Sequence, residues 1–141
     1  MIYIRTKSVM RRVLSDPRAT HYEVLGISPG ELDPAELKDA RRCIALLFHP
    51  DLVADQDRRT AHDLMSRANT AYRVLSNNAE RVRYDASLLS THGKCPVCSG
   101  EGFKRKQRGF KSQDKLKCLG CDGNGWVLKP AVKSGQKRSA P

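Results

Sequence analysis

The sequence contains no apolar run of 18 or more residues. A helix needs about 20 mainly apolar residues to cross a bilayer, so we expect no membrane span and no membrane partner. The start of the chain also lacks the apolar core and the small-residue cleavage site of a secretory signal. We therefore expect a soluble, cytoplasmic protein. A short targeting peptide within residues 1–19, and with it an organelle matrix, is the alternative that the basic start leaves open.

Acidic residues are scarce at both ends of the chain, whose formal net charge is +11. Residues 1–20 carry five basic and one acidic side chain, residues 21–92 nine and eleven, and residues 93–141 twelve and three, so the net charges are +4, −2 and +9. The central region is thus almost neutral. Basic ends suit a nucleic acid, an acidic protein surface or solubility alone, and charge does not distinguish these.

Strand patterns are absent before residue 92, and apolar residues recur there at helical spacing. Thr20 suits the N-cap of a short helix that Gly26 ends. Asp33 suits the N-cap of a second helix, with Pro34 in its first position. The second and third helices carry matching apolar stripes, so we expect an antiparallel pair. The fold is therefore predicted to be mainly α, with helices at residues 21–25, 34–48, 58–75 and 79–88.

A polar break, Phe48-His49-Pro50-Asp51, separates the two long predicted helices. Pro50 cannot continue a helix and biases His49 away from the α region, so an imidazole and a carboxylate are displayed at a corner. A hydrolase needs a nucleophile with an oriented base, or a metal with an open position, and no Ser or Cys lies beside this pair in the sequence. We predict that the protein is not an enzyme. The corner instead suits recognition, because a fixed carboxylate offers charge-assisted hydrogen bonds to a partner's arginine.

The sequences around this break resemble the J domain of the DnaJ co-chaperones. They are Tyr-Glu-Val-Leu-Gly-Ile at 22–27, Ala-Asn-Thr-Ala-Tyr-Arg-Val-Leu-Ser at 68–76 and Arg-Tyr-Asp at 83–85. The resemblance implies a four-helix J domain at residues 20–90, preceded by a basic lead-in at 1–19. It also implies docking on a DnaK-type chaperone and stimulation of that partner's ATP hydrolysis. The implied partner-binding residues are His49, Pro50 and Asp51 in the corner, and Lys38, Arg41 and Arg42 on the second helix.

Three positions of the second helix depart from the family pattern. Asp39, Cys43 and Leu47 stand where relatives often carry basic residues, which weakens electrostatic attraction to an acidic partner surface. Cys43 is also the one cysteine that lies apart from the other four. A lone cysteine in a helical pattern is usually a small buried hydrophobe, and we expect that of Cys43.

The other four cysteines form two copies of the pattern Cys-x-x-Cys-x-Gly-x-Gly, with nineteen residues between the pairs. Two such pairs supply four thiolates to one tetrahedral zinc, and the glycines allow tight turns that aim backbone amides at sulfur. A disulfide framework and a redox-active pair are the alternatives, although nothing marks the chain as secreted. The predicted zinc is structural, because cysteine fills every position. Its ligands are Cys95, Cys98, Cys118 and Cys121.

These repeats resemble half of the cysteine-rich domain of DnaJ proteins, and only residues 89–94 separate them from the predicted J domain. We expect a β-hairpin module at residues 93–128, which we call the cysteine module, and a disordered basic tail at 129–141. The segment between the cysteine pairs is basic and carries Phe103 and Phe110, with Trp126 just after the second pair. Its candidate contact residues are Lys104, Arg105, Lys106, Arg108, Phe110 and Lys111.

Three interpretations of this basic segment remain open. The cations and exposed aromatics could bind phosphate and stack bases, the hairpin could contact an unfolded or acidic client protein, or the aromatics could simply pack over the zinc core. The leading functional prediction is a J-domain co-chaperone that uses the cysteine module for a client or partner. The alternative is a zinc-ribbon nucleic-acid binder with a J-like helical scaffold.

Overall fold

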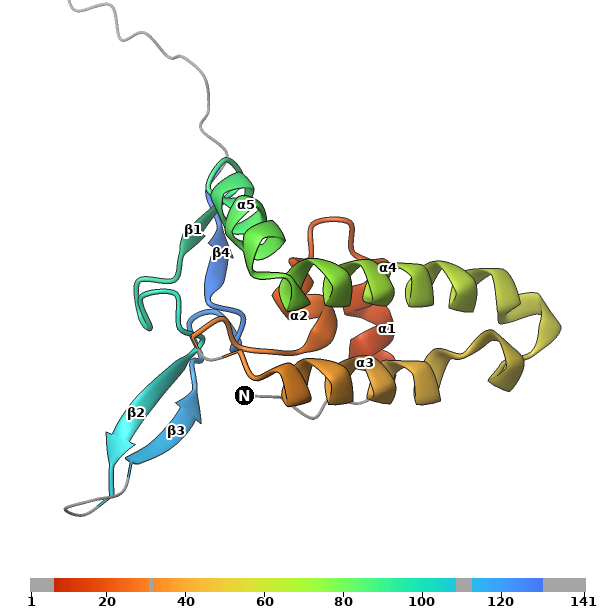
Figure 1. Cartoon of the computed structure of the whole chain (residues 1–141), viewed down its shortest axis with the longest axis horizontal. Coiled ribbons are helices and arrows are strands. Elements are labelled where there is room, and N and C mark those ends of the chain that lie inside the picture. Colours follow the sequence, from red (N-terminus) through yellow and green to blue (C-terminus); the bar gives the residue numbers. More distant parts are fainter. Residues whose placement is uncertain (1–6, 31, 109–112, 131–141) are drawn as a thin grey trace, which may run out of the picture.

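The structure is a computed structural model, and it describes residues 7–30, 32–108 and 113–130. Within these residues the chain forms five α-helices, two short 3₁₀ turns and four strands (Figure 1). None of the helices there is long and apolar enough to cross a membrane. The helices are α1 (Lys7–Ser15), α2 (His21–Leu25), α3 (Pro34–Phe48), α4 (Arg58–Ser76) and α5 (Asn78–Leu88), and the 3₁₀ turns are η1 (Pro50–Leu52) and η2 (Asp55–Asp57). The strands are β1 (His92–Lys94), β2 (Phe103–Gln107), β3 (Gln113–Lys117) and β4 (Trp126–Leu128).

The helical core lies between α3 and α4, which run side by side in opposite directions, with α2 packed against them (Figure 1). This confirms the predicted mainly α fold and its antiparallel pair. The predicted cap residues also have their expected contacts. Thr20 forms a capping box with Glu23, Gly26 ends α2 in the left-handed region at φ 70°, and the Asp33 side chain accepts from Ala35 N–H. The buried residues of this core include Tyr22, Ile27, Leu37, Ala40, Ile44, Phe48, Leu64, Ala68, Ala71 and Leu75.

Helix α1 was not among the predicted helices. It packs on α2 and α4 within the segment predicted as a basic lead-in. Its residue Leu14 is only 2% exposed, and Arg67 of α4 donates from Nη1 to the Leu14 carbonyl at 2.6 Å. Lys7, at its start, lies 5.8 Å from the centre of the Phe48 ring. The lead-in therefore packs on the helical domain through buried Leu14 and partly buried Met10, and the half-buried Arg67 of α4 bonds to its backbone.

The strands form two separate antiparallel pairs, β1 with β4 and β2 with β3. The pair β2–β3 is the predicted hairpin, with Phe103 opposite Lys117 and Gln107 opposite Gln113. The second pair was not predicted. It places His92 opposite Leu128 and closes the two ends of the cysteine module against each other. Figure 1 shows β1 and β4 beside α5, with the hairpin extending away from the helices.

His21 gives the helical domain a predicted pH dependence. Its ring stacks on Tyr84 at 4.2 Å, and burial, with a further contribution from Arg67, lowers its pKa from the ordinary value of 6.5. The unfolded chain therefore binds more protons than the folded one just below pH 6.5. His21 therefore does not reduce the free energy of unfolding well above pH 6.5, and it reduces it increasingly as the pH drops towards the pKa of His21 in the folded protein.

We expect His21→Gln to reduce the loss of stability between about pH 7.5 and about pH 5.5. The measurement is the urea unfolding midpoint at both values. His62→Gln is the matched control, because the His62 side chain is 78% exposed, and the acid response of the cysteine cluster is common to all three proteins. An unchanged pH response in His21→Gln would contradict the assignment.

Candidate functional site

The break after α3 forms an exposed corner made of His49, Pro50 and Asp51. Pro50 starts the 3₁₀ turn η1, and His49 before it is extended at φ −61° and ψ 132°. The Asp51 amide donates to His49 Nδ1 at 3.3 Å, and the Asp51 carboxylate lies 3.4 Å from the same nitrogen. Because Nδ1 accepts the amide hydrogen, a neutral His49 ring carries its proton on Nε2. The Asp51 side chain is 83% exposed, so a partner can reach its carboxylate.

The basic residues predicted on the second helix are exposed on α3. Lys38 and Arg42 are four residues apart and form one ridge towards the corner. Arg41 is turned towards α4, where its Nε donates to Asn69 Oδ1 at 2.9 Å and its guanidinium lies 5.1 Å from the Tyr72 ring centre. Arg41 therefore bridges the two long helices, whereas Lys38 and Arg42 are exposed on the surface of α3.

Two exposed apolar residues beside the corner were not among the predicted site residues. Leu46 is 65% exposed and continues the ridge of Lys38 and Arg42, while Leu52 in η1 is 66% exposed. The sequence could have indicated Leu46, because it falls outside the inward-facing apolar stripe of α3. The prediction for Cys43 was wrong, because Cys43 is exposed. It precedes the buried Ile44 by one residue, and that step of a helix turns it out of the core.

Residues 20–85 match the family model of the DnaJ domain. This segment is a J domain. Its relatives include the chaperone protein DnaJ of Chlorobium luteolum, 46% identical over 65 residues that cover 46% of this chain and 16% of that protein. The chaperone protein DnaJ of Clostridium tetani is 42% identical over 69 residues, or 49% of this chain and 18% of the relative. The chain thus spans less than a fifth of these two relatives.

An uncharacterized J domain-containing protein of Schizosaccharomyces pombe is also similar, at 36% identity over 74 residues. These cover 52% of this chain and 35% of that protein. No solved structure gives a significant match. The match to the family model ends at residue 85, before the first cysteine of the module. The match therefore says nothing about the cysteine module.

The four predicted cysteine ligands come together. Their Sγ atoms all lie within 4.8 Å of one another and are buried. Two of the separations are 3.9 Å, for Cys95 to Cys118, and 3.7 Å, for Cys98 to Cys121. A tetrahedral zinc with Zn–S bonds of about 2.3 Å requires Sγ atoms about 3.8 Å apart. The cluster therefore has the size and donor set of a four-thiolate metal site.

The surroundings of the sulfurs fit thiolates. The amide of Gly102 donates to Cys98 Sγ at 3.2 Å, and that of Gly125 donates to Cys121 Sγ at 3.1 Å, as the glycine spacing predicts. Burial raises the pKa of the Cys98 and Cys121 thiols. For Cys118, burial also acts to raise the pKa, but hydrogen bonds from the Cys121 and Gly120 backbone outweigh it and the pKa is lowered. Holding all four as thiolates requires a cation.

The basic segment is largely confirmed as a hairpin but not as an exposed aromatic surface. Phe103 is 1% exposed and Trp126 is 4% exposed. The Arg105 guanidinium and the Lys115 ammonium lie 5.4 Å and 5.2 Å from the Phe103 ring centre. Lys104, Arg105 and Lys106 lie on the exposed strand β2, and Arg108 pairs with Asp114 at 3.4 Å. Phe110 and Lys111 lie outside the described residues.

Proposed function

We propose that this protein is a co-chaperone that docks on a DnaK-type chaperone and stimulates its ATP hydrolysis. The docking residues are His49, Pro50 and Asp51 of the corner, with Lys38, Arg41 and Arg42 of α3. The observation that supports this most is the exposed Asp51 carboxylate at the end of α3, within a segment that matches the DnaJ domain. The ATPase is the partner's, and the protein itself is not an enzyme.

The chemistry of docking follows from the corner. Pro50 restricts the backbone between the two polar side chains, so little conformational entropy is lost when a partner arginine binds Asp51. An arginine can make two parallel hydrogen bonds to one carboxylate. Lys38 and Arg42 attract an acidic partner surface and accelerate encounter, while exposed Leu46 beside them adds apolar contact area. Asp39 on the same helix is exposed and reduces this attraction.

We propose further that the cysteine cluster holds one structural Zn²⁺ through Cys95, Cys98, Cys118 and Cys121. With four thiolates there is no open coordination position, so zinc would supply a cross-link rather than catalysis. The buried sulfur atoms and their amide donors support this assignment.

For the hairpin we propose contact with an unfolded or acidic client protein. The exposed cations of β2 suit acidic segments, and Leu116 of β3, 51% exposed and paired with Lys104, offers an apolar contact beside them. Base stacking, which the nucleic-acid alternative needs, is not open to Phe103 or Trp126 because both are buried. Among the described residues, the structure thus favours a protein client over a nucleic acid.

The test is the steady-state ATPase rate of a purified DnaK-type chaperone with and without this protein. We expect the rate to rise with added protein and to saturate, and the protein alone to hydrolyse no ATP. Zinc content is measured on the same preparation. No rise at any concentration of correctly folded, zinc-loaded protein would contradict the proposed function.

A further inference from the structure

The cysteine module rests on the J domain through the loops that follow each cysteine pair. The amide of Gly30 donates to the Glu101 carbonyl at 3.0 Å, after the first pair. The Ser28 hydroxyl donates to the Gly123 carbonyl at 3.2 Å, after the second pair. Ser28 has no exposed surface. Both contacts join the turn between α2 and α3 to the module.

One hydroxyl links the module to the start of α2. Thr20 Oγ1 accepts from the Glu23 amide and so caps α2, and it lies 2.5 Å from Asn124 Oδ1, to which it donates. The Asn124 side-chain amide in turn donates to the Trp126 carbonyl at 3.1 Å. Thr20 and Asn124 are 1% and 5% exposed. Loss of Asn124 from this position would leave a buried hydroxyl without its acceptor.

Strand β4 divides its side chains between the two cores. Trp126 belongs to the buried cluster that contains Tyr22, Ile27 and Ile44, whereas Val127 packs against the cysteines. Consecutive residues of a strand point to opposite faces, and here one face is the J-domain core and the other is the metal site. Among the described residues, the buried apolar side chains of the module are the four cysteines, Phe103 and Trp126. Trp126 belongs to the J-domain core, so the module's own apolar core is small.

The glycines that position the sulfur donors are also pressed against the J domain. Gly125 has φ +78°, and a Cβ there would lie 2.5 Å from Pro29 Cγ. Gly102 has φ +84°, and a Cβ there would lie 3.0 Å from the Ser28 side chain. The amides of these two residues are the donors to Cys121 and Cys98. The loop conformations that direct these amides at the sulfurs are therefore also the conformations that pack against the J domain.

From these contacts we infer that the metal site controls the stability of the J domain. Without a metal, the module has too little apolar burial to keep its loops folded. Unfolding of those loops removes Trp126 from the helical core and the acceptor from Thr20, which weakens α2. The J domain and the cysteine module then form one folding unit that depends on metal. The inference concerns folding; it rests on the proposed zinc site and not on the proposed partner.

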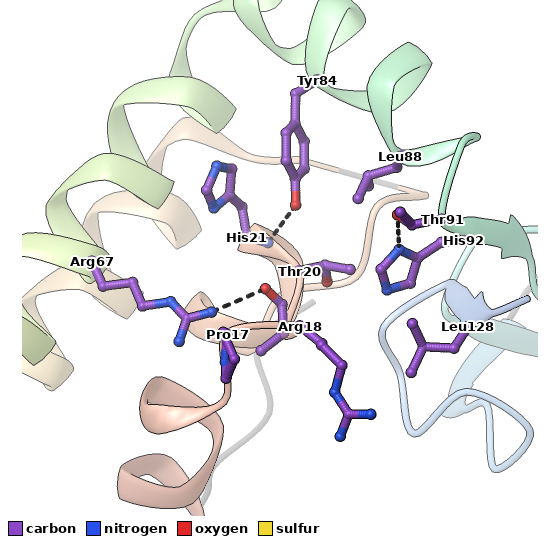
Figure 2. A pocket seen from close by; sticks show the side chains of 11 residues that line it. Pro17, Arg18, Thr20, His21, Arg67, Tyr84, Leu88, Thr91, His92 and Leu128 are labelled. Carbon is purple, nitrogen blue, oxygen red and sulfur yellow. Dashed lines mark hydrogen bonds between the residues drawn. The ribbon is translucent and has the colours of Figure 1, made fainter. Parts of the chain in front are cut away.

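A cavity lies along one edge of the junction, so the J domain and the module do not pack closely along their whole interface. Its volume is about 590 Å³. Figure 2 shows Thr20, His21 and Tyr84 on the J-domain side, and His92 and Leu128 on the module side. The junction therefore depends on Trp126 and on a few buried polar contacts. The module residues that make these contacts lie within a few positions of a cysteine.

The test uses the full zinc-loaded chain and removes the metal with a chelator, with zinc release measured directly. Trp126 is the chain's only tryptophan, so its fluorescence reports the junction. We expect its emission to shift to longer wavelength, and amide exchange in α2 to accelerate by about tenfold or more. Both changes should reverse when zinc is returned. Unchanged emission and unchanged α2 exchange after complete zinc release would overturn the inference.

Two variants separate metal loss from loss of contact. Cys43→Ser removes the cysteine outside the cluster and should respond to the chelator as the unaltered protein does. Asn124→Ala keeps all four ligands but breaks the link to Thr20. In the presence of zinc we expect it to retain the metal and still show faster exchange in α2. Zinc retention with normal α2 exchange in Asn124→Ala would count against the proposed coupling.

Discussion

Replacing Asp51 with asparagine should reduce the stimulation of a DnaK-type ATPase nearly to the background rate at the concentration at which the unaltered protein gives half-maximal stimulation. The substitution keeps the size of the side chain but removes its charge. A hydrogen bond to a charged group contributes about 1.5–3 kcal/mol, so losing it weakens the partner complex by about ten- to a hundredfold. Because the Asp51 side chain is 83% exposed, the fold should not change. The measurement is the partner's ATPase rate across a titration of the variant.

A second exposed His-Asp pair provides the control for this experiment. His62 and Asp63 lie on α4 with 3.9 Å between Nδ1 and Oδ1, and their side chains are 78% and 74% exposed. Asp63→Asn should stimulate as the unaltered protein does, whereas His49→Gln should fail as Asp51→Asn fails. Helicity by circular dichroism and zinc content should be unchanged in all three. Full stimulation by both corner variants would refute the proposed docking site.

Replacing Trp126 with alanine should lower the free energy of unfolding by about 3–5 kcal/mol, the usual cost of removing a large buried aromatic side chain. Domains of this kind are stable by only about 5–15 kcal/mol, so the variant should be partly unfolded at 37 °C. The loss should be seen in the helices as well as in the module, because Trp126 is 4% exposed within the J-domain core. Urea unfolding followed by circular dichroism at 222 nm measures it.

The size of the Trp126 effect can be checked with two further variants. The Trp126 indole Nε1 is buried with no hydrogen-bond partner among the described residues, so Trp126→Phe removes an unsatisfied donor and should cost less than half as much. Leu119→Ala should change stability by less than about 0.5 kcal/mol, because Leu119 is 90% exposed in the same module. A Trp126→Ala protein as stable as Leu119→Ala would show that Trp126 does not support the core.

Local chemistry made much of the structure predictable. Thr20, Gly26 and Asp33 end or begin helices through contacts within a few residues, and Pro50 interrupts α3 by covalent geometry alone. The cysteine cluster was predictable in part for the same reason, since each short repeat fixes the spacing of two cysteines. In each of these cases the cause lies within a few residues along the chain.

The docking of the module on the J domain was not predictable, because the residues that make the contacts are far apart in the sequence. Thr20 and Asn124 are 104 residues apart, and Ser28 and Gly123 are 95 apart. Strand β4 has only three residues, which predicts alternation but not which core each face meets. Packing of the aromatics over the zinc core was one of the three open interpretations, and Trp126 lies in the J-domain core instead. Helix α1 was missed because its apolar face is narrow, with Leu14 buried and Met10 partly buried against the core.

The short connection between α5 and β1 and the contacts of the module with Thr20, Ser28 and Gly30 set the place of the β2–β3 hairpin relative to the described helices. Figure 1 shows the break after α3 at one end of the long helices and the β2–β3 hairpin at the other. Helix α4 has 19 residues, which corresponds to a length of about 28 Å at 1.5 Å per residue. A client held at the hairpin would thus be presented at a constant spacing and angle from the chaperone. Only a client whose exposed segment is long enough to span this distance would then reach the proposed chaperone partner.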